Sequence, residues 1–136
     1  MKKSAFFAAL AVIGLAATPA LAEDLSAHLG GVGSPDTDGA GHATFKIDTA
    51  KNEVCYTVMV EKIGVATAAH VHKGAAGASG PPVVPMTKPE AAGKSSGCAT
   101  VDAAVVKDIL ANPAGYYVNV HNAEFPGGAI RGQLMK

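Results

Sequence analysis

The sequence predicts an all-β protein in which about seven or eight short antiparallel strands and one short helix form a β-sandwich. Three observations support this class. Short valine-bearing segments recur between turns, apolar and polar residues alternate within several of them, and the 136 residues include 16 glycines and 8 prolines. Alternation gives each strand one apolar face, so two sheets can pack around one core. The expected shape is immunoglobulin-like.

The first 22 residues have the features of a secretory signal peptide. A lysine-containing start precedes an uncharged apolar run from 5 to 17, and Ala20-Leu21-Ala22 is an A-x-A cleavage site. We therefore expect a signal peptide at 1–22 and one domain at 23–136, with no later apolar run long enough to span a membrane. The expected location is periplasmic or secreted.

The charge balance disfavours a nucleic-acid partner. The full chain has 11 basic and 11 acidic residues, and loss of Lys2 and Lys3 with the leader makes the mature chain slightly acidic. Nucleic-acid binding depends on a basic surface that neutralises phosphates. The mature composition lacks such an excess of basic residues.

In the first half of the domain, an edge strand is expected at 25–29 and a turn-rich loop at 30–41. The segments 43–48 and 53–63 then alternate apolar and polar residues on either side of a turn at 49–52, which is typical of a β-hairpin. Their apolar residues are expected to face the core: Ala43, Phe45, Ile47, Val54, Tyr56, Val58 and Val60.

In the middle of the chain, a strand is expected at 66–73, followed by a small, flexible loop. The segment 81–86 contains three prolines, which confine it to the edge of a sheet. A surface loop is expected at 88–97 and a short strand at 97–101.

The only helix expected begins at the N-cap residue Asp102 and stops at Asn112-Pro113. Its apolar residues recur at helical spacing: Val105, Val106, Ile109 and Leu110. Two strands then close the chain at 115–121 and 130–134, on either side of a turn at Pro126-Gly127-Gly128.

The two cysteines, Cys55 and Cys98, fall on the outward side of their predicted strands. In an exported chain, two cysteines are expected to form a structural disulfide. The alternative is a pair of thiolate metal ligands, but no C-x-x-C spacing supports it.

The run Ala69-His70-Val71-His72 places two imidazoles on one face of a strand, because successive side chains of a strand alternate. The same alternation puts His121 and Arg131 on the outer faces of the last two strands. If the histidine-bearing strands are neighbours, three imidazoles can converge on one ion, and neutral imidazole suits copper, zinc or nickel. His42, also on an outer face, is a candidate fourth ligand.

A structural role is the alternative for these histidines, because each ring can donate an N–H to a loop carbonyl. Met59, Met86 and Met135 are further candidate donors for Cu(I), although methionine more often fills a core or an edge. Common enzyme signatures are absent from the sequence: it has neither a glycine-rich phosphate loop nor a G-x-S-x-G turn.

Several blocks of the sequence resemble the CHRD domain, the module named after chordin. These blocks are Ala69-His70-Val71-His72-Lys73-Gly74, Gly80-Pro81-Pro82-Val83-Val84, Tyr116-Tyr117-Val118-Asn119-Val120-His121 and Pro126-Gly127-Gly128-Ala129-Ile130-Arg131-Gly132-Gln133-Leu134. The resemblance runs from about Leu25 to Leu134, so the domain at 23–136 is expected to be a CHRD domain. It implies an exported module: microbial members mostly have no assigned activity, and chordin is a non-enzymatic extracellular binder of growth factors.

The CHRD family in turn looks like copper-zinc superoxide dismutase, which implies a Greek-key sandwich with a metal site outside the core. In this resemblance, His70 and His72 are similar to the His-x-His copper ligands, and His121 is similar to a third copper ligand. Arg131 is similar to the arginine that guides the anionic substrate, which would place it beside the ligands. Between His72 and Val83 there is no histidine or aspartate, so the bridging imidazole and the zinc ligands have no counterpart.

These inferences predict an exported, non-enzymatic CHRD module that binds a transition metal, copper in preference to zinc, through His70, His72 and His121. The rival hypothesis is a module that binds an extracytoplasmic protein or polymer and uses its histidines only to brace loops. A superoxide dismutase-like enzyme is the least favoured interpretation, because half of the dismutase ligand set is missing.

Overall fold

The computed structural model describes residues 22–136 apart from 32 and 76. The signal peptide expected at 1–22 falls outside the described residues, except for Ala22, and stays a prediction. Among the described residues, no helix has the length and apolar character needed to cross a membrane.

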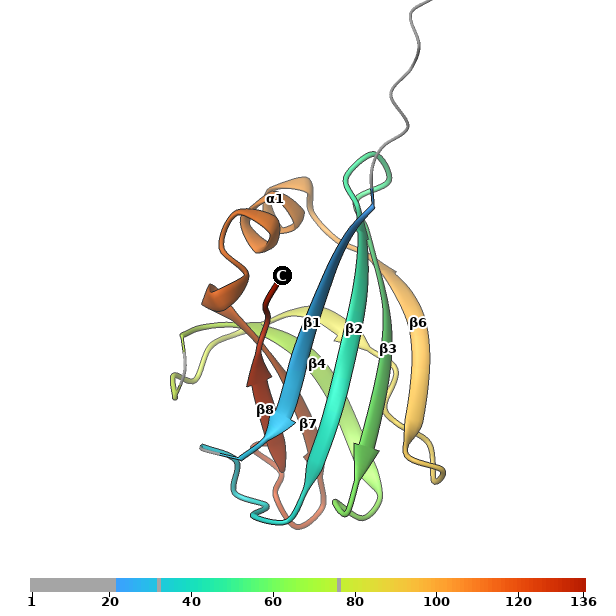
Figure 1. Ribbon diagram of the computed structural model, residues 1–136, viewed down its shortest axis with the longest axis vertical. Coiled ribbons are helices and arrows are strands. Elements are labelled where there is room, and N and C mark those ends of the chain that lie inside the picture. The colour runs from blue at the N-terminus through green and yellow to red at the C-terminus, as the bar shows by residue number, and fades with distance from the viewer. Residues whose placement is uncertain (1–21, 32, 76) are drawn as a thin grey trace, which may run out of the picture.

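Two antiparallel sheets of four strands pack face to face (Figure 1). The first sheet has the strand order β1-β2-β3-β6 and the second β5-β4-β7-β8. The strands are β1 (Glu23–Gly30), β2 (Ala40–Asp48), β3 (Glu53–Glu61), β4 (Ala66–Lys73), β5 (Pro82–Met86), β6 (Lys94–Thr100), β7 (Tyr116–Asn122) and β8 (Ile130–Gln133). The predicted all-β sandwich is therefore confirmed, with eight strands in the part of the chain that the structure describes.

The core lies between the two sheets and follows the alternation of the sequence. The residues expected to face inward on β2 and β3 are all at most 8% exposed: Ala43, Phe45, Ile47, Val54, Tyr56, Val58 and Val60. On β4, Ala69 and Val71 are likewise buried, which turns His70 and His72 to the opposite, outer face.

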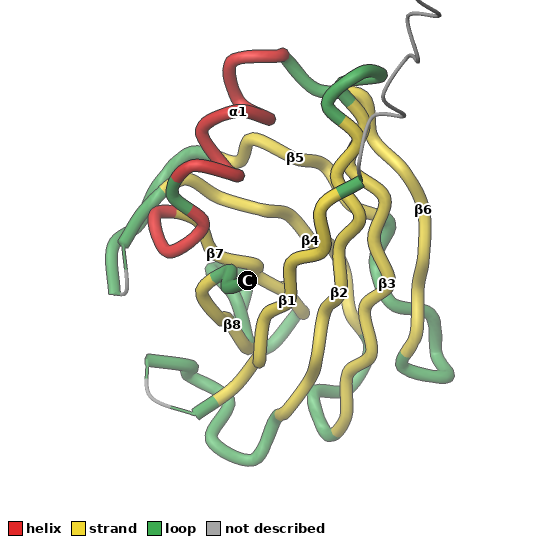
Figure 2. The backbone as a smooth tube through the Cα atoms, turned by 45° about the horizontal axis from the view of Figure 1, so that its top comes forward, coloured by secondary structure: helices red, strands yellow, loops and turns green. Residues whose placement is uncertain are grey.

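The helix α1 (Ala103–Ala111) closes one end of the sandwich (Figure 2). It follows Asp102 as predicted, although the Asp102 side chain makes no capping hydrogen bond, and it ends where the Asn112 N–H bonds to the Asp108 carbonyl. Val106 and Ile109 are each 1% exposed and belong to the core. Apolar burial therefore holds this short helix in place.

The disulfide expected between Cys55 and Cys98 is present. The two residues face each other directly across β3 and β6. Although Glu53 lies close to both sulfurs, the bonded cysteines offer no thiolate, so the alternative of a cysteine metal site does not apply.

Strand β6 begins at Lys94, within the segment where a surface loop was expected over 88–97. Small polar residues gave no apolar alternation here, but the backbone pairs with β3, with Ser95 opposite Val58 and Gly97 opposite Tyr56. An edge strand tolerates such a sequence because only one of its sides must pair. The Ser95 hydroxyl also donates to the Thr87 carbonyl at 2.8 Å.

Strand β5 lies at the edge of the second sheet, as its prolines predicted. It pairs with β4, placing Pro85 opposite His70 and Pro82 opposite His72, with a bulge between Val71 and His72.

Candidate metal centre

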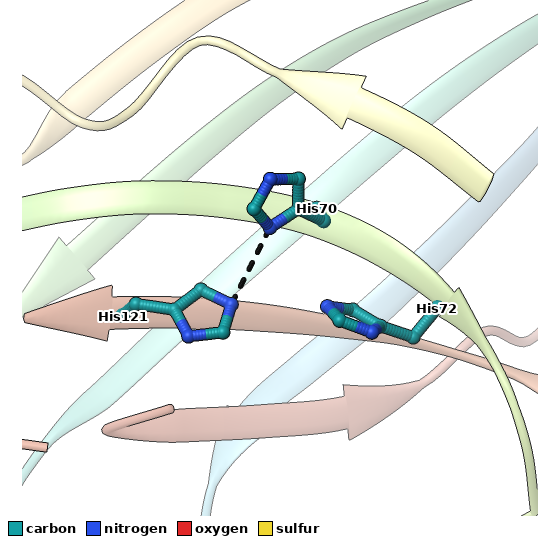
Figure 3. Close-up of side chains that lie close together, drawn as sticks. All are labelled: His70, His72 and His121. Carbon is teal, nitrogen blue, oxygen red and sulfur yellow. Dashed lines mark hydrogen bonds between the residues drawn. The ribbon is translucent and has the colours of Figure 1, made fainter. Parts of the chain in front are cut away.

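Three histidines gather on the outer face of the second sheet (Figure 3). His70 and His72 come from β4, and His121 comes from β7. The two strands are antiparallel neighbours in which Asn119 pairs with His70 and Ala68 with His121. One candidate ligand atom from each histidine lies within 4.8 Å of the other two. The strand pairing that would bring the imidazoles together is therefore present.

His121 is held by a backbone carbonyl in the turn before β8. Its Nδ1 lies 3.0 Å from the Pro126 carbonyl oxygen, which can only accept, so Nδ1 carries the proton and donates. The neutral ring then has its lone pair on Nε2. That atom lies 3.4 Å from the Nδ1 of His70 (Figure 3).

His72 is oriented in the same way by the loop between β4 and β5. Its Nδ1 donates to the Gly80 carbonyl at 2.9 Å, which leaves the lone pair of the neutral ring on Nε2. This Nε2 atom is buried and has no hydrogen-bond partner among the described residues. A buried polar atom without a partner costs about 1–3 kcal/mol, and a metal ion would remove that cost.

The environment of His70 favours its uncharged form. Burial lowers the pKa of its imidazole, and the positive charge that His121 and His72 can carry lowers it further. Neutral imidazole is the form that binds metal ions. The burial and the neighbouring imidazoles that disfavour protonation of His70 therefore keep it in the form that can bind a metal ion.

An aromatic ring and a guanidinium form the layer next to His72. The Tyr117 ring stacks on the His72 ring with 5.1 Å between centroids and 9° between planes. On Tyr117 lies the guanidinium of Arg131, whose Cζ is 4.8 Å from the ring centroid. Arg131 is thus beside the histidine cluster, in contact with Tyr117.

Loops cover this side of the sheet and are fixed to it by side chains. The Tyr117 hydroxyl accepts the Gly80 N–H at 3.1 Å, and an Arg131 guanidinium nitrogen, Nη1, donates to the Ala78 carbonyl at 3.2 Å. Asn119 donates to the Gly127 carbonyl at 3.1 Å. Tyr117 and Asn119, which alternate with the core residues of β7 as His121 does, are therefore only 2% exposed.

The structure does not bring His42 to this cluster, so the expectation that it supplies a fourth ligand is corrected. His42 lies on β2 in the first sheet, where it pairs with His28. It does face outward, but the outer faces of the two sheets of a sandwich point in opposite directions. Alternation along a strand predicts on which side of its own sheet a side chain lies, but it does not predict which of the two sheets the strand joins.

Sequence reasoning assigned no role in the site to Gly80 or Tyr117. Gly80 uses both backbone groups there, because its carbonyl accepts from His72 and its N–H donates to Tyr117. The small residues after the histidines predicted only a flexible loop, and did not indicate that Gly80 is held in place. Its link to Tyr117, 37 positions later, is set by tertiary structure.

A profile described as CHRD domain matches residues 25–134. The chain belongs to the CHRD domain family. The matched part of the CHRD domain contains the three clustered histidines, Arg131 and both cysteines. No curated protein and no solved structure matches the chain.

Proposed function

We propose that this CHRD domain is an exported, non-enzymatic module that binds a transition metal ion through His70, His72 and His121. The observation that carries the proposal is the anchoring of His72 and His121 through Nδ1 to backbone carbonyls. Both rings thereby hold Nε2 as a lone-pair donor beside His70, before any ion arrives. Metal-ligating histidines commonly have such a hydrogen bond on the second nitrogen.

Copper is the preferred metal. The cluster contains three neutral nitrogen donors and no carboxylate or thiolate from the described residues. Imidazole nitrogens bind copper more tightly than other divalent first-row metals, whereas a structural zinc site is normally closed by four protein ligands. Three histidines can also hold a zinc ion that keeps a position for solvent, so the preference for copper depends on its tighter binding to imidazole.

Two observations support export. The Cys55–Cys98 disulfide is of a kind that persists in oxidising compartments outside the cytoplasm. The A-x-A site at Ala20-Leu21-Ala22, after a charged start and an apolar run, is the expected mark of cleavage by a signal peptidase. We infer a periplasmic or secreted location for the mature domain.

The segment between His72 and Val83 supports a non-enzymatic role. It contains neither a histidine nor an aspartate, so it supplies no ligand for a second metal ion next to the cluster. Dismutation of superoxide needs a redox-active copper with tuned potential, and the ligand set for that tuning is incomplete.

A copper titration followed by electron paramagnetic resonance tests this proposal. The mature protein with one equivalent of Cu²⁺ is expected to give a spectrum of nitrogen-coordinated copper, and His72→Ala is expected to change it. Lys107→Ala removes an exposed side chain from α1, away from every histidine, and is the control. Absence of a bound signal, or the same spectrum in His72→Ala, would refute the proposal.

The second candidate function is an interaction module for an extracytoplasmic protein or polymer. The same hydrogen bonds to Gly80 and Pro126 favour it, because they also brace the two loops over the sheet. In that case His72→Ala lowers the melting temperature equally with and without copper. Metal binding instead predicts that copper stabilises the wild type more than the variant.

A further inference from the structure

A second group of metal donors lies on the outer face of the first sheet. His28 on β1 pairs directly with His42 on β2, and His42 pairs directly with Met59 on β3. The centroids of the two imidazole rings are 5.0 Å apart, with 47° between planes. Residues that face each other across neighbouring strands have Cβ atoms about 4.5–5.5 Å apart, within reach of a shared ion.

Met59 is notable for its exposure. It is 49% exposed, and only Val65 and Met135 are other exposed large apolar side chains in the described part of the chain. Because Met59 pairs with His42 across β2 and β3, its thioether side chain lies on the same face as the two imidazoles, within reach of them. Thioether sulfur is a ligand that selects Cu(I) over harder cations.

The two imidazoles are also free to bind. Unlike His72 and His121, neither His28 nor His42 makes a side-chain hydrogen bond to another described residue. No hydrogen bond fixes the tautomer of either ring, so in each neutral imidazole either nitrogen can act as the donor. Around them, Lys94 lies opposite Met59, and Glu61 lies two residues beyond Met59 on the same strand face. One cation and one anion leave the local charge close to balanced.

We propose that His28, His42 and Met59 form a second, solvent-exposed metal site that takes Cu(I). The site lies on the sheet opposite to the histidine cluster and shares no residue with it, so it goes beyond the function proposed above. Two imidazoles and one thioether form a compact neutral donor set, which suits a monovalent soft ion. Because the site is exposed to solvent, we expect it to exchange copper with molecules in solution and not to retain the ion permanently.

Competition with a colorimetric Cu(I) chelator under anaerobic conditions tests the second site on the mature protein. The double variant His28→Ala/His42→Ala is expected to bind one equivalent of Cu(I) less than the wild type. Met59→Leu is expected to weaken the affinity of that equivalent about tenfold, because a hydrocarbon replaces the sulfur donor. Met135→Leu removes another exposed methionine and should leave the titration unchanged.

An independent readout is the proton NMR signal of the Met59 methyl group, which is expected to shift when Cu(I) is added. The same shift is expected in His72→Ala. An unchanged Cu(I) stoichiometry in the double variant, or a methyl signal that does not move, would overturn the second site. His72→Ala separates this failure from failure of the first proposal, because it alters the cluster and leaves β1, β2 and β3 intact.

Discussion

The ring of Tyr117 lies nearly parallel to the ring of His72, with 5.1 Å between centroids. The Tyr117 hydroxyl accepts the N–H of Gly80, and the Gly80 carbonyl accepts the Nδ1 proton of His72. One aromatic ring and one glycine thus determine both the orientation of the His72 ring and the nitrogen that carries its proton. Orientation and tautomer are the two properties that a ligand histidine must have settled before an ion binds.

Replacing Tyr117 by leucine is expected to weaken copper binding without unfolding the domain. Leucine fills part of the buried volume but offers neither a stacking plane to His72 nor an acceptor to Gly80. Loss of such support typically lowers metal affinity by about 10–100-fold. Competition titration with a copper chelator measures the change. Tyr117→Phe keeps the stacking plane and should lose less affinity, and equal losses in the two variants would contradict a role for stacking.

Gly80→Ala is expected to loosen the loop that anchors His72. A Cβ at this position would lie 1.5 Å from the Lys73 carbonyl oxygen, so the loop must move. The Gly80 carbonyl would then leave the His72 Nδ1, and copper affinity should fall. Gly127→Ala is the control, since a Cβ there meets no atom within 4 Å. Wild-type affinity in Gly80→Ala would show that the His72 anchor is unimportant.

Below neutral pH, the contact between Asp108 and Tyr116 predicts a loss of stability. The hydrogen bond from the Tyr116 hydroxyl lowers the pKa of Asp108 below its usual value. Burial opposes this shift, and the positive charge of nearby Lys73 adds to it. A carboxyl whose pKa is lower in the folded state stabilises the fold above its unfolded pKa, and this contribution is lost as pH falls through the folded pKa. Tyr116→Phe should therefore be less stable than the wild type at pH 7, with the difference closing in acid. Urea unfolding at both pH values measures it.

At alkaline pH, the contact between Tyr116 and Asp108 predicts a second loss of stability. Burial and the hydrogen bond to Asp108 raise the pKa of Tyr116 to about 12. A group whose pKa is raised in the folded state contributes stability below its unfolded pKa and loses it as pH rises through the folded value. The wild type should therefore weaken from pH 10 toward pH 12, and Tyr116→Phe should show a smaller decline. Parallel declines would contradict the assignment.

Removing the disulfide is expected to reduce stability and to leave the histidine cluster intact. The bond closes 43 positions of chain, a constraint of about 4 kcal/mol on the unfolded state. Cys55 and Cys98 lie in the first sheet, whereas His72 lies in the second. Cys55→Ala/Cys98→Ala should thus lower the free energy of unfolding while copper affinity is kept. A matching drop in affinity would indicate that the sheets are coupled.

Much of this fold follows from local sequence patterns. Alternation predicted that Phe45 and Ile47 face the core and that His70, His72 and His121 face outward, because the direction of a side chain on a strand depends only on its place in the strand. Turn residues and prolines likewise marked the hairpins and the edge strand β5. Each of these features is set by neighbours along the chain.

The remaining features depend on partners that are distant in sequence. His42 was predicted to share a site with His70, but strand order places it in the other sheet. Tyr117 is on the outer face of β7, on the same side as His121, yet the covering loop buries it, and no local sequence pattern indicates that loop. Strand β6 begins early because β3 offers it a pairing edge. Which sheet a strand joins and where a loop lies both depend on residues distant in sequence, so local sequence patterns could not predict them.

The prolines of β5 also affect how copies of the domain can meet. Pro82 and Pro85 lie opposite His72 and His70, on the outermost strand of the second sheet. Because proline has no N–H to donate, a strand from another molecule cannot continue the ladder there. Self-association through sheet extension, the first step of aggregation in many β-proteins, is blocked at the border nearest to the imidazoles. Any neighbour on that side must recognise side chains.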